Sequence, residues 1–142
     1  MVGRKMAVLL VTCLLLAGAS YSFSHAGSEP ENPKKGTTLG KHVTAAEAYE
    51  MWRSKPEQIE ILDVRTPEEY VFVGHAPMAA NIPFKVWREL RTEEKKAFDL
   101  SENPDFVALV TKYYNPTDTI VIMCRSGDRA AKAVNALAKA RW

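Results

Sequence analysis

Cys124 stands where a strand predicted at residues 119–123 gives way to a helix predicted at residues 127–140. In that position the thiol faces the free N–H groups and the positive dipole end of the helix, and both favour the thiolate. Arg125 and Arg129 add two positive charges. A loop of this kind can hold an anion, so the sequence indicates a nucleophilic cysteine in a site for phosphate, a sulfur oxyanion or a persulfide.

The rest of this loop is Ser126, Gly127 and Asp128. Gly127 allows the backbone to bend so that several N–H groups point at one place, and we expect residues 125–129 to bind the substrate anion. Arg129 is expected to fold back over the loop, with Arg125 at the mouth of the pocket. The alternative is a structural cysteine at a strand end, followed by a helix with surface arginines.

Other polar residues have less specific signals. Asp63 and Arg65 end a predicted strand, and we interpret them as a buried ion pair near the site rather than as catalytic groups. His75 follows Gly74 in a loop and is expected to form a local hydrogen bond. The three histidines are scattered along the chain, so we expect neither a metal site nor a cofactor.

The elements that must position these residues alternate between strands and helices. The segments 44–47 and 66–69 both have the Thr-x-x-Glu spacing of a capping box, which predicts two helix starts. Short apolar runs predict strands at 59–64, 79–84 and 119–123. This alternation predicts an α/β fold with a mainly parallel sheet and helices on both faces.

The segment 85–115 lies between the second and third of these strands. Its many charges indicate a partly helical stretch over 85–103. A further helix is expected to start at Asn103-Pro104, to carry Phe106 and Val110 into the core, and to end at Asn115-Pro116. We expect 85–115 to be a helical elaboration that contacts a partner or shields the site.

The composition is that of a folded domain of ordinary size. The chain has 142 residues, 46% of them hydrophobic and 25% charged, with a formal net charge of +2. A charge so close to zero gives no electrostatic reason to expect binding to nucleic acid.

The first 26 residues have the pattern of a secretory signal peptide. A basic pair, Arg4 and Lys5, precedes an apolar run over 6–19, and Ser24-His25-Ala26 resembles a cleavage site. We expect export, with the bacterial periplasm as the compartment; an uncleaved membrane anchor is the alternative. Cleavage would also remove Cys13 and leave Cys124 as the only thiol. Residues 27–41 are rich in Gly, Pro and charge and are predicted to be a flexible linker before a domain at 42–142.

Residues 59–142 resemble a single-domain rhodanese, a sulfurtransferase domain of the α/β class. The resemblance is carried by the segment 62–70 (LDVRTPEEY), by the segments 74–77 (GHAP) and 81–84 (NIPF), and by the loop 124–129 (CRSGDR). It implies that a persulfide forms on Cys124 and passes to an acceptor. Thiosulfate or a similar small sulfur anion is the implied donor, and a thiol, cyanide or a protein the implied acceptor.

The sequence departs from this family in places. Met78 stands where the family usually has glycine, and the connection 84–119 is longer than usual. The family continues past the helix at 127–140 into a strand that lies beside the active-site strand. The chain ends at Trp142, so we expect the domain to be truncated at its C-terminus and to lack that last strand.

Two other functions remain open. A phosphatase or an arsenate reductase also uses a cysteine in an oxyanion loop, but phosphatase loops place one residue more between Cys and Arg than the four found here. An arsenate reductase also needs resolving thiols, which the mature chain would lack. The other alternative is a non-enzymatic module, including a carrier that hands its persulfide to one partner protein.

Overall fold

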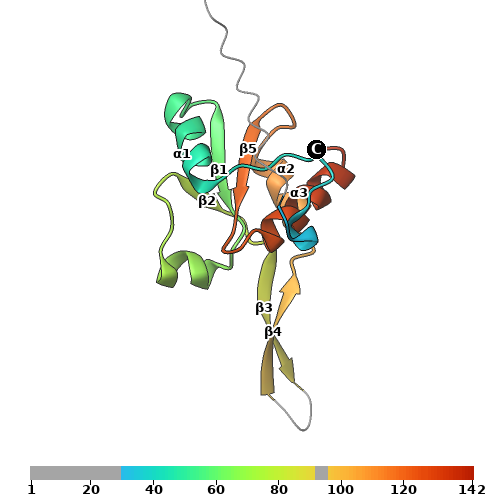
Figure 1. Cartoon of the computed structure of the whole chain (residues 1–142). Coiled ribbons are helices and arrows are strands. Elements are labelled where there is room, and N and C mark those ends of the chain that lie inside the picture. The colour runs from blue at the N-terminus through green and yellow to red at the C-terminus, as the bar shows by residue number, and fades with distance from the viewer. Residues whose placement is uncertain (1–29, 92–95) are drawn as a thin grey trace, which may run out of the picture.

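The computed structural model describes residues 30–91 and 96–142. The elements follow one another along the chain as η1 (Pro33–Lys35), α1 (Ala45–Ser54), β1 (Ile59–Asp63), η2 (Glu69–Val73), β2 (Ala79–Asn81), β3 (Lys85–Arg91), β4 (Lys96–Glu102), α2 (Phe106–Tyr113), β5 (Thr119–Met123) and α3 (Asp128–Lys139). Figure 1 shows the main body, from which β3 and β4 project as a separate arm.

A parallel sheet in the order β2-β1-β5 forms the centre of the body. β1 lies between its two partners, with Ile61 opposite Ala79 on one side and opposite Val121 on the other. The two strands that precede the candidate site therefore end at the same edge of the sheet. The parallel sheet and its helices confirm the predicted α/β class.

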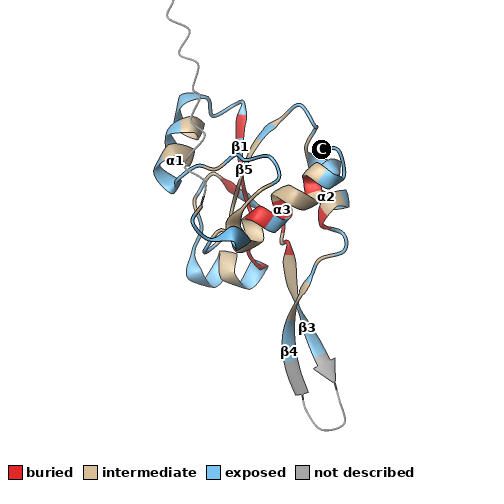
Figure 2. Cartoon of the chain, turned by 45° about the vertical axis from the view of Figure 1, so that its right-hand side comes forward, coloured by how far each residue is buried: buried red, intermediate tan, exposed pale blue. Residues whose placement is uncertain are grey.

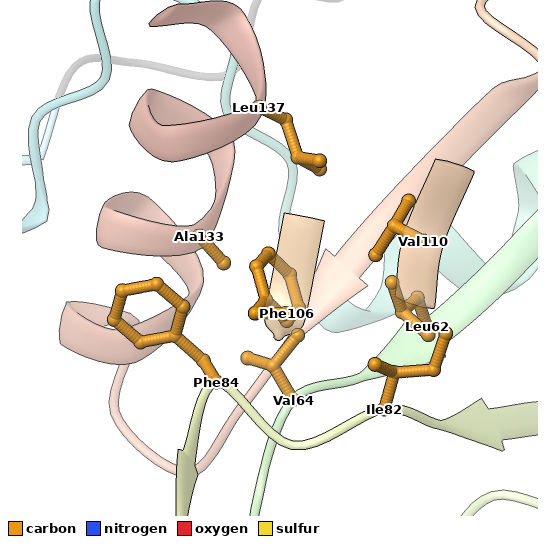
Figure 3. Close-up of a cluster of buried hydrophobic side chains, with 8 residues drawn as sticks. All are labelled: Leu62, Val64, Ile82, Phe84, Phe106, Val110, Ala133 and Leu137. Carbon is orange, nitrogen blue, oxygen red and sulfur yellow. The ribbon is translucent and has the colours of Figure 1, made fainter. Parts of the chain in front are cut away.

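The two faces of this sheet have separate apolar clusters because side chains alternate along each strand. On one face Ile59 and Ile61 of β1 pack with Met51 and Trp52 of α1. The other face carries the larger cluster, which Figure 3 shows between the strands and helices α2 and α3: Leu62, Val64, Ile82, Phe84, Phe106, Val110, Ala133 and Leu137. Helices thus cover both faces, as predicted.

Both predicted capping boxes are present. Thr44 and Glu47 exchange side-chain and backbone hydrogen bonds at the start of α1, and Thr66 and Glu69 do the same before η2. The predicted helix start near Asn103 is also confirmed by α2, which buries Phe106 and Val110. The strand predicted at 79–84 is shorter than expected and covers only Ala79–Asn81.

The prediction of a partly helical stretch over 85–103 is wrong. β3 and β4 form an antiparallel hairpin in which Trp87 lies opposite Leu100 and Glu89 opposite Phe98. At the base of the hairpin the two strands are joined by a further hydrogen bond, from the Asn103 N–H to the Phe84 carbonyl at 2.9 Å. Cross-strand pairing of apolar and aromatic side chains outweighs the helix preference of the charged residues. Figure 2 shows that the described part of the hairpin is largely exposed.

The part of the predicted linker that the structure describes lies against α3. The Thr38 N–H donates to Asn135 Oδ1 at 2.8 Å, and the side chain of Lys35 lies beside Gly127. The predicted cleavage of residues 1–26 lies outside the described residues. Among the described residues, no helix is both long and apolar enough to cross a membrane.

A groove of about 890 Å³ runs along β5, between residues 37–44 and α3. Within the described residues β5 pairs only with β1, so its other edge is open to this groove. His42 and Trp142 line this groove. Their buried nitrogens, His42 Nε2 and Trp142 Nε1, have no hydrogen-bond partner among the described residues. The expected further strand beside β5 stays a prediction.

Candidate active site

Cys124 directly follows β5 at the carboxyl edge of the sheet, and its side chain is half-buried. Its Sγ accepts hydrogen bonds from the backbone N–H of Gly127 at 3.2 Å and of Ala130 at 3.4 Å. These donors belong to the turn before α3 and to the first turn of that helix. The sulfur therefore lies where N–H groups and the helix dipole stabilise negative charge.

Gly127 makes this close approach possible. Its φ is 97°, in the left-handed region that other residues rarely adopt, and it caps the N-terminus of α3. The turn brings the N–H groups of residues 127 and 130 onto one atom, as the sequence suggested. A side chain added at Gly127 would also meet the Cδ of Lys35 at 3.3 Å.

The two arginines of the loop have different surroundings. Arg125 is exposed, and it has no ion pair or hydrogen-bond partner among the residues the structure describes. Arg129 is more buried, and its guanidinium binds both carboxylate oxygens of Glu69, at 2.5 and 2.8 Å. Arg125 is therefore a cation without a partner within the described residues, whereas the Glu69 carboxylate holds Arg129 from the segment after β1.

The pair of Glu69 and Arg129 is strongly favoured in its charged form. The hydrogen bonds from Arg129 lower the pKa of Glu69 to about 2, helped by the backbone N–H of Thr66 and opposed by partial burial. The same carboxylate raises the pKa of Arg129, and the nearby Cys124 sulfur acts in the same direction. Arg129 therefore attracts negative charge on the sulfur as well as on Glu69.

Asp63 and Arg65 form a second charge pair next to the first. The Arg65 Nη2 lies 2.6 Å from Asp63 Oδ2, and both side chains are buried. Arg65 also donates to the carbonyl of Gly74 at 2.8 Å, so the pair ties the end of β1 to the loop before β2. This is the strand-to-loop ion pair expected from the sequence. The Asp63 carboxylate raises the pKa of Arg65.

The remaining polar residues take local roles. His75 stacks on the ring of Tyr70 with centroids 3.6 Å apart, and its Nδ1 donates to the Tyr70 carbonyl at 2.9 Å. Asp128 pairs with Lys132 at 3.3 Å along α3, and Ser126 is exposed. In the part of the chain that is described, no group of three or more His, Cys, Asp and Glu side chains could hold a metal ion.

Comparison with protein families gives a match to the rhodanese-like domain over residues 44–142. The chain belongs to this family. The match includes the sheet, the Cys124 loop and both charge pairs of this rhodanese-like domain.

Curated relatives point the same way. The chain is 40% identical over 76 residues to thiosulfate sulfurtransferase 16, chloroplastic, of Arabidopsis thaliana, which is 54% of this chain and 56% of the relative. It is 29% identical over 109 residues to rhodanese-like domain-containing protein 15, chloroplastic, of the same plant, covering 70% and 55% of the two chains. Thiosulfate sulfurtransferase 18, also from that plant, is 35% identical over 85 residues, 58% and 56% of the two chains. The chain spans about half of the length of these relatives.

The sequence analysis of this rhodanese-like domain missed three residues near the site. Glu69 was recognised only as part of a capping box, although the same spacing places it at the edge where β1 and β5 end. Asn81 donates from Nδ2 to the carbonyls of Asp63 and Arg65, both at 2.9 Å. Lys35 lies against Gly127 from the segment predicted as a linker. No local pattern signals the last two contacts, because they join residues far apart in the sequence.

Proposed function

We propose that the domain is a sulfurtransferase in which Cys124 carries the sulfur. The thiolate attacks the outer sulfur of thiosulfate, the sulfur–sulfur bond of the donor breaks, and sulfite leaves with the electron pair. A persulfide remains on Cys124. A thiophilic acceptor such as cyanide or a thiolate then attacks the outer sulfur of the persulfide and restores the thiolate.

The observation that carries this proposal is the pair of N–H groups directed at Sγ. Donors from Gly127 and Ala130 stabilise a negative sulfur both before the attack and when it leaves the persulfide. The family match and the relatives named as thiosulfate sulfurtransferases support the same chemistry.

The remaining loop residues are proposed to bind the donor. Arg125 is exposed and unpaired within the described residues, so its guanidinium is available for the oxygens of an incoming dianion. Arg129 adds a fixed positive charge beside the loop. Ser126, Gly127 and Asp128 form the rim between them, where backbone N–H groups and the Ser126 hydroxyl can donate to the bound anion.

Intact mass spectrometry tests the proposal directly. The purified protein is measured before and after thiosulfate, and again after cyanide. We expect a gain of one sulfur atom on wild type that cyanide removes, and no gain on Cys124→Ser. A wild-type protein that takes up no sulfur from thiosulfate or from a persulfide donor would contradict the proposal.

The same preparation separates the alternatives. Release of phosphate from a phosphate ester, if this activity is lost in Cys124→Ser, would indicate that the protein is a phosphatase. A stable persulfide that cyanide and small thiols remove only slowly would indicate a carrier for a protein acceptor. The proposed acceptor in the cell is a thiophilic group, which belongs either to a small molecule or to a protein.

Residues 1–26 are proposed to be a targeting segment, since a basic start precedes an apolar run. Two of the relatives are named as chloroplast proteins, which supports targeting in general and gives no support to the bacterial periplasm. N-terminal sequencing of the protein from its native cell tests this, with a mature start near Gly27 as the expected result. Retention of Met1 on membrane-bound protein would indicate the anchor.

A further inference from the structure

Glu69 lies outside the active-site loop, but its carboxylate holds a residue inside it. Both Glu69 oxygens accept from the Arg129 guanidinium. Arg129 stands between the two residues whose N–H groups donate to Cys124 Sγ, Gly127 and Ala130. A contact that fixes Arg129 therefore acts on the short stretch of backbone that faces the sulfur.

Glu69 is itself firmly placed. Its Oε2 accepts from the backbone N–H of Thr66 at 3.1 Å, and its own N–H donates to Thr66 Oγ1 at 3.2 Å. Thr66 is fully buried and directly follows the buried pair of Asp63 and Arg65. The carboxylate is therefore connected to β1, the central strand of the sheet, and can serve as a fixed point for Arg129.

We propose that Glu69 is a positioning residue for sulfur transfer: through Arg129 it keeps the N–H groups of Gly127 and Ala130 directed at Cys124 Sγ. This inference rests on the proposed function in one respect, that the Cys124 thiolate is the nucleophile. In this role Glu69 does not touch the donor; it acts only through the loop.

The charges around the sulfur allow the positioning role of Glu69 to be tested, because its loss and a simple change of charge should shift the ionisation of Cys124 in opposite directions. Asp63 with Arg65 and Glu69 with Arg129 are two paired sets, and Asp128 is paired with Lys132. Arg125 is exposed, and the side chain of Lys35 lies against Gly127 from the segment before α1. Removing the Glu69 charge alone would leave more positive charge near the sulfur and would favour the thiolate. Loosening the loop would instead withdraw the N–H donors and disfavour it. The two effects shift the thiolate in opposite directions.

The experiment uses the full chain and the rate at which iodoacetamide alkylates Cys124, measured across pH by mass spectrometry of the peptide that contains it. In Glu69→Gln the amide oxygen can still accept from the Thr66 N–H, so the cap is kept while the ion pair is lost. We expect the midpoint pH of alkylation to rise by about half a unit to one unit. Arg129→Lys, which keeps its charge but loses the two-point contact, should shift it in the same direction.

Glu68→Gln is the matched control, because Glu68 is an exposed neighbour and, among the described residues, makes no hydrogen bond or ion pair with Arg129. It removes the same charge one residue away and should leave the midpoint unchanged or slightly lower. A midpoint in Glu69→Gln that falls, or that equals that of Glu68→Gln, would overturn the proposal.

Two further measurements keep the result interpretable. Circular dichroism checks that each variant is folded, and Glu69→Asp, which keeps the charge but shortens the side chain, replaces Glu69→Gln if that variant does not fold. A shortened carboxylate should also raise the midpoint, and an unchanged midpoint would count against positioning. Alkylation needs no sulfur donor, so this test can succeed or fail independently of sulfur uptake from thiosulfate.

Discussion

The carboxyl edge of the sheet and the β3–β4 hairpin differ in how many parts of the chain hold them. At the edge, segments from β1, from the loop before β2 and from α3 are joined by two ion pairs and by backbone donors to Cys124. The hairpin is made by the two strands that pair within it, and its base is tied at Phe84 and Asn103. Trp87 and Phe98 are 50% and 72% exposed on it.

This difference indicates where a single substitution can have a large effect. A group at the sheet edge that loses its partner leaves a buried charge or a misplaced donor, which is costly. A hairpin side chain that is already exposed has little to lose. The site should therefore be sensitive to small changes and the hairpin tolerant of them, in stability as well as in activity.

The largest effect is expected for Cys124→Ser. The serine hydroxyl cannot form a persulfide, so sulfur transfer from thiosulfate to cyanide should fall by at least about 1,000-fold, to the level without enzyme. The thermal midpoint should change little, because the side chain is only half-buried and of similar size. Appreciable transfer by this variant would remove Cys124 from the mechanism.

Asp63→Ala should have a large effect on stability. It leaves Arg65 buried without its partner, and removal of one member of a buried pair typically costs about 3–5 kcal/mol. Urea denaturation measures this change in the free energy of unfolding. The matched control is Glu50→Ala, which breaks the exposed pair of Glu50 and Arg53 on α1 and should have no measurable effect. Equal effects of the two substitutions would show that burial of the ion pair does not determine its contribution to stability.

The candidate site also shows what the sequence could and could not predict. The strand-to-helix transition at Cys124, the glycine in the loop and the capping box at Thr66 are local patterns with direct physical meaning, and each appears in the structure. The pairing of Glu69 with Arg129 joins residues 60 positions apart, so no local pattern reveals it. It follows only once β1 and β5 are known to be neighbours.

The hairpin was mispredicted for a related reason. Residues such as Glu89, Leu100 and the charges around them are compatible with a helix when each strand is considered alone. Strand pairing depends on contacts between the two strands, such as the hydrogen bond from Asn103 to Phe84 at the base and Trp87 opposite Leu100. The proposed contact of this segment with a partner stays a prediction, now for a hairpin and not for a helix.

Gly127→Ala should give an intermediate effect. A φ of 97° disfavours a side chain, and a non-glycine residue in such a region costs about 1–3 kcal/mol. If the turn relaxes to avoid this strain, the Gly127 N–H moves away from Cys124 Sγ and sulfur uptake slows. Both the free energy of unfolding and the rate of persulfide formation should fall. Ser126→Ala, at an exposed neighbour, is the control for stability alone.

A smaller effect is expected from acid. The pKa of Glu69 is lowered from 4.5 to about 2 in the folded protein, so its pair with Arg129 contributes stability above pH 4.5. This contribution should be lost as the pH falls from about 4.5 to about 2, because the carboxylate must then release Arg129 to bind a proton. Urea denaturation from pH 6 to pH 2 should show a steeper loss in wild type than in Glu69→Gln. Parallel curves would show that the pair does not contribute in solution.

The smallest effect is expected in the hairpin, for the double substitution of Trp87→Ser with Phe98→Ser. Both side chains are exposed, so the free energy of unfolding should change by less than about 1 kcal/mol, and transfer from thiosulfate to cyanide should be unchanged. Phe106→Ala is the contrast: this ring is 2% exposed, packs edge-to-face on Phe84, and its loss should cost about 3–5 kcal/mol. A double variant as unstable as Phe106→Ala would mean that Trp87 and Phe98 are covered in solution, and the hairpin would then belong with the tightly held parts of the molecule.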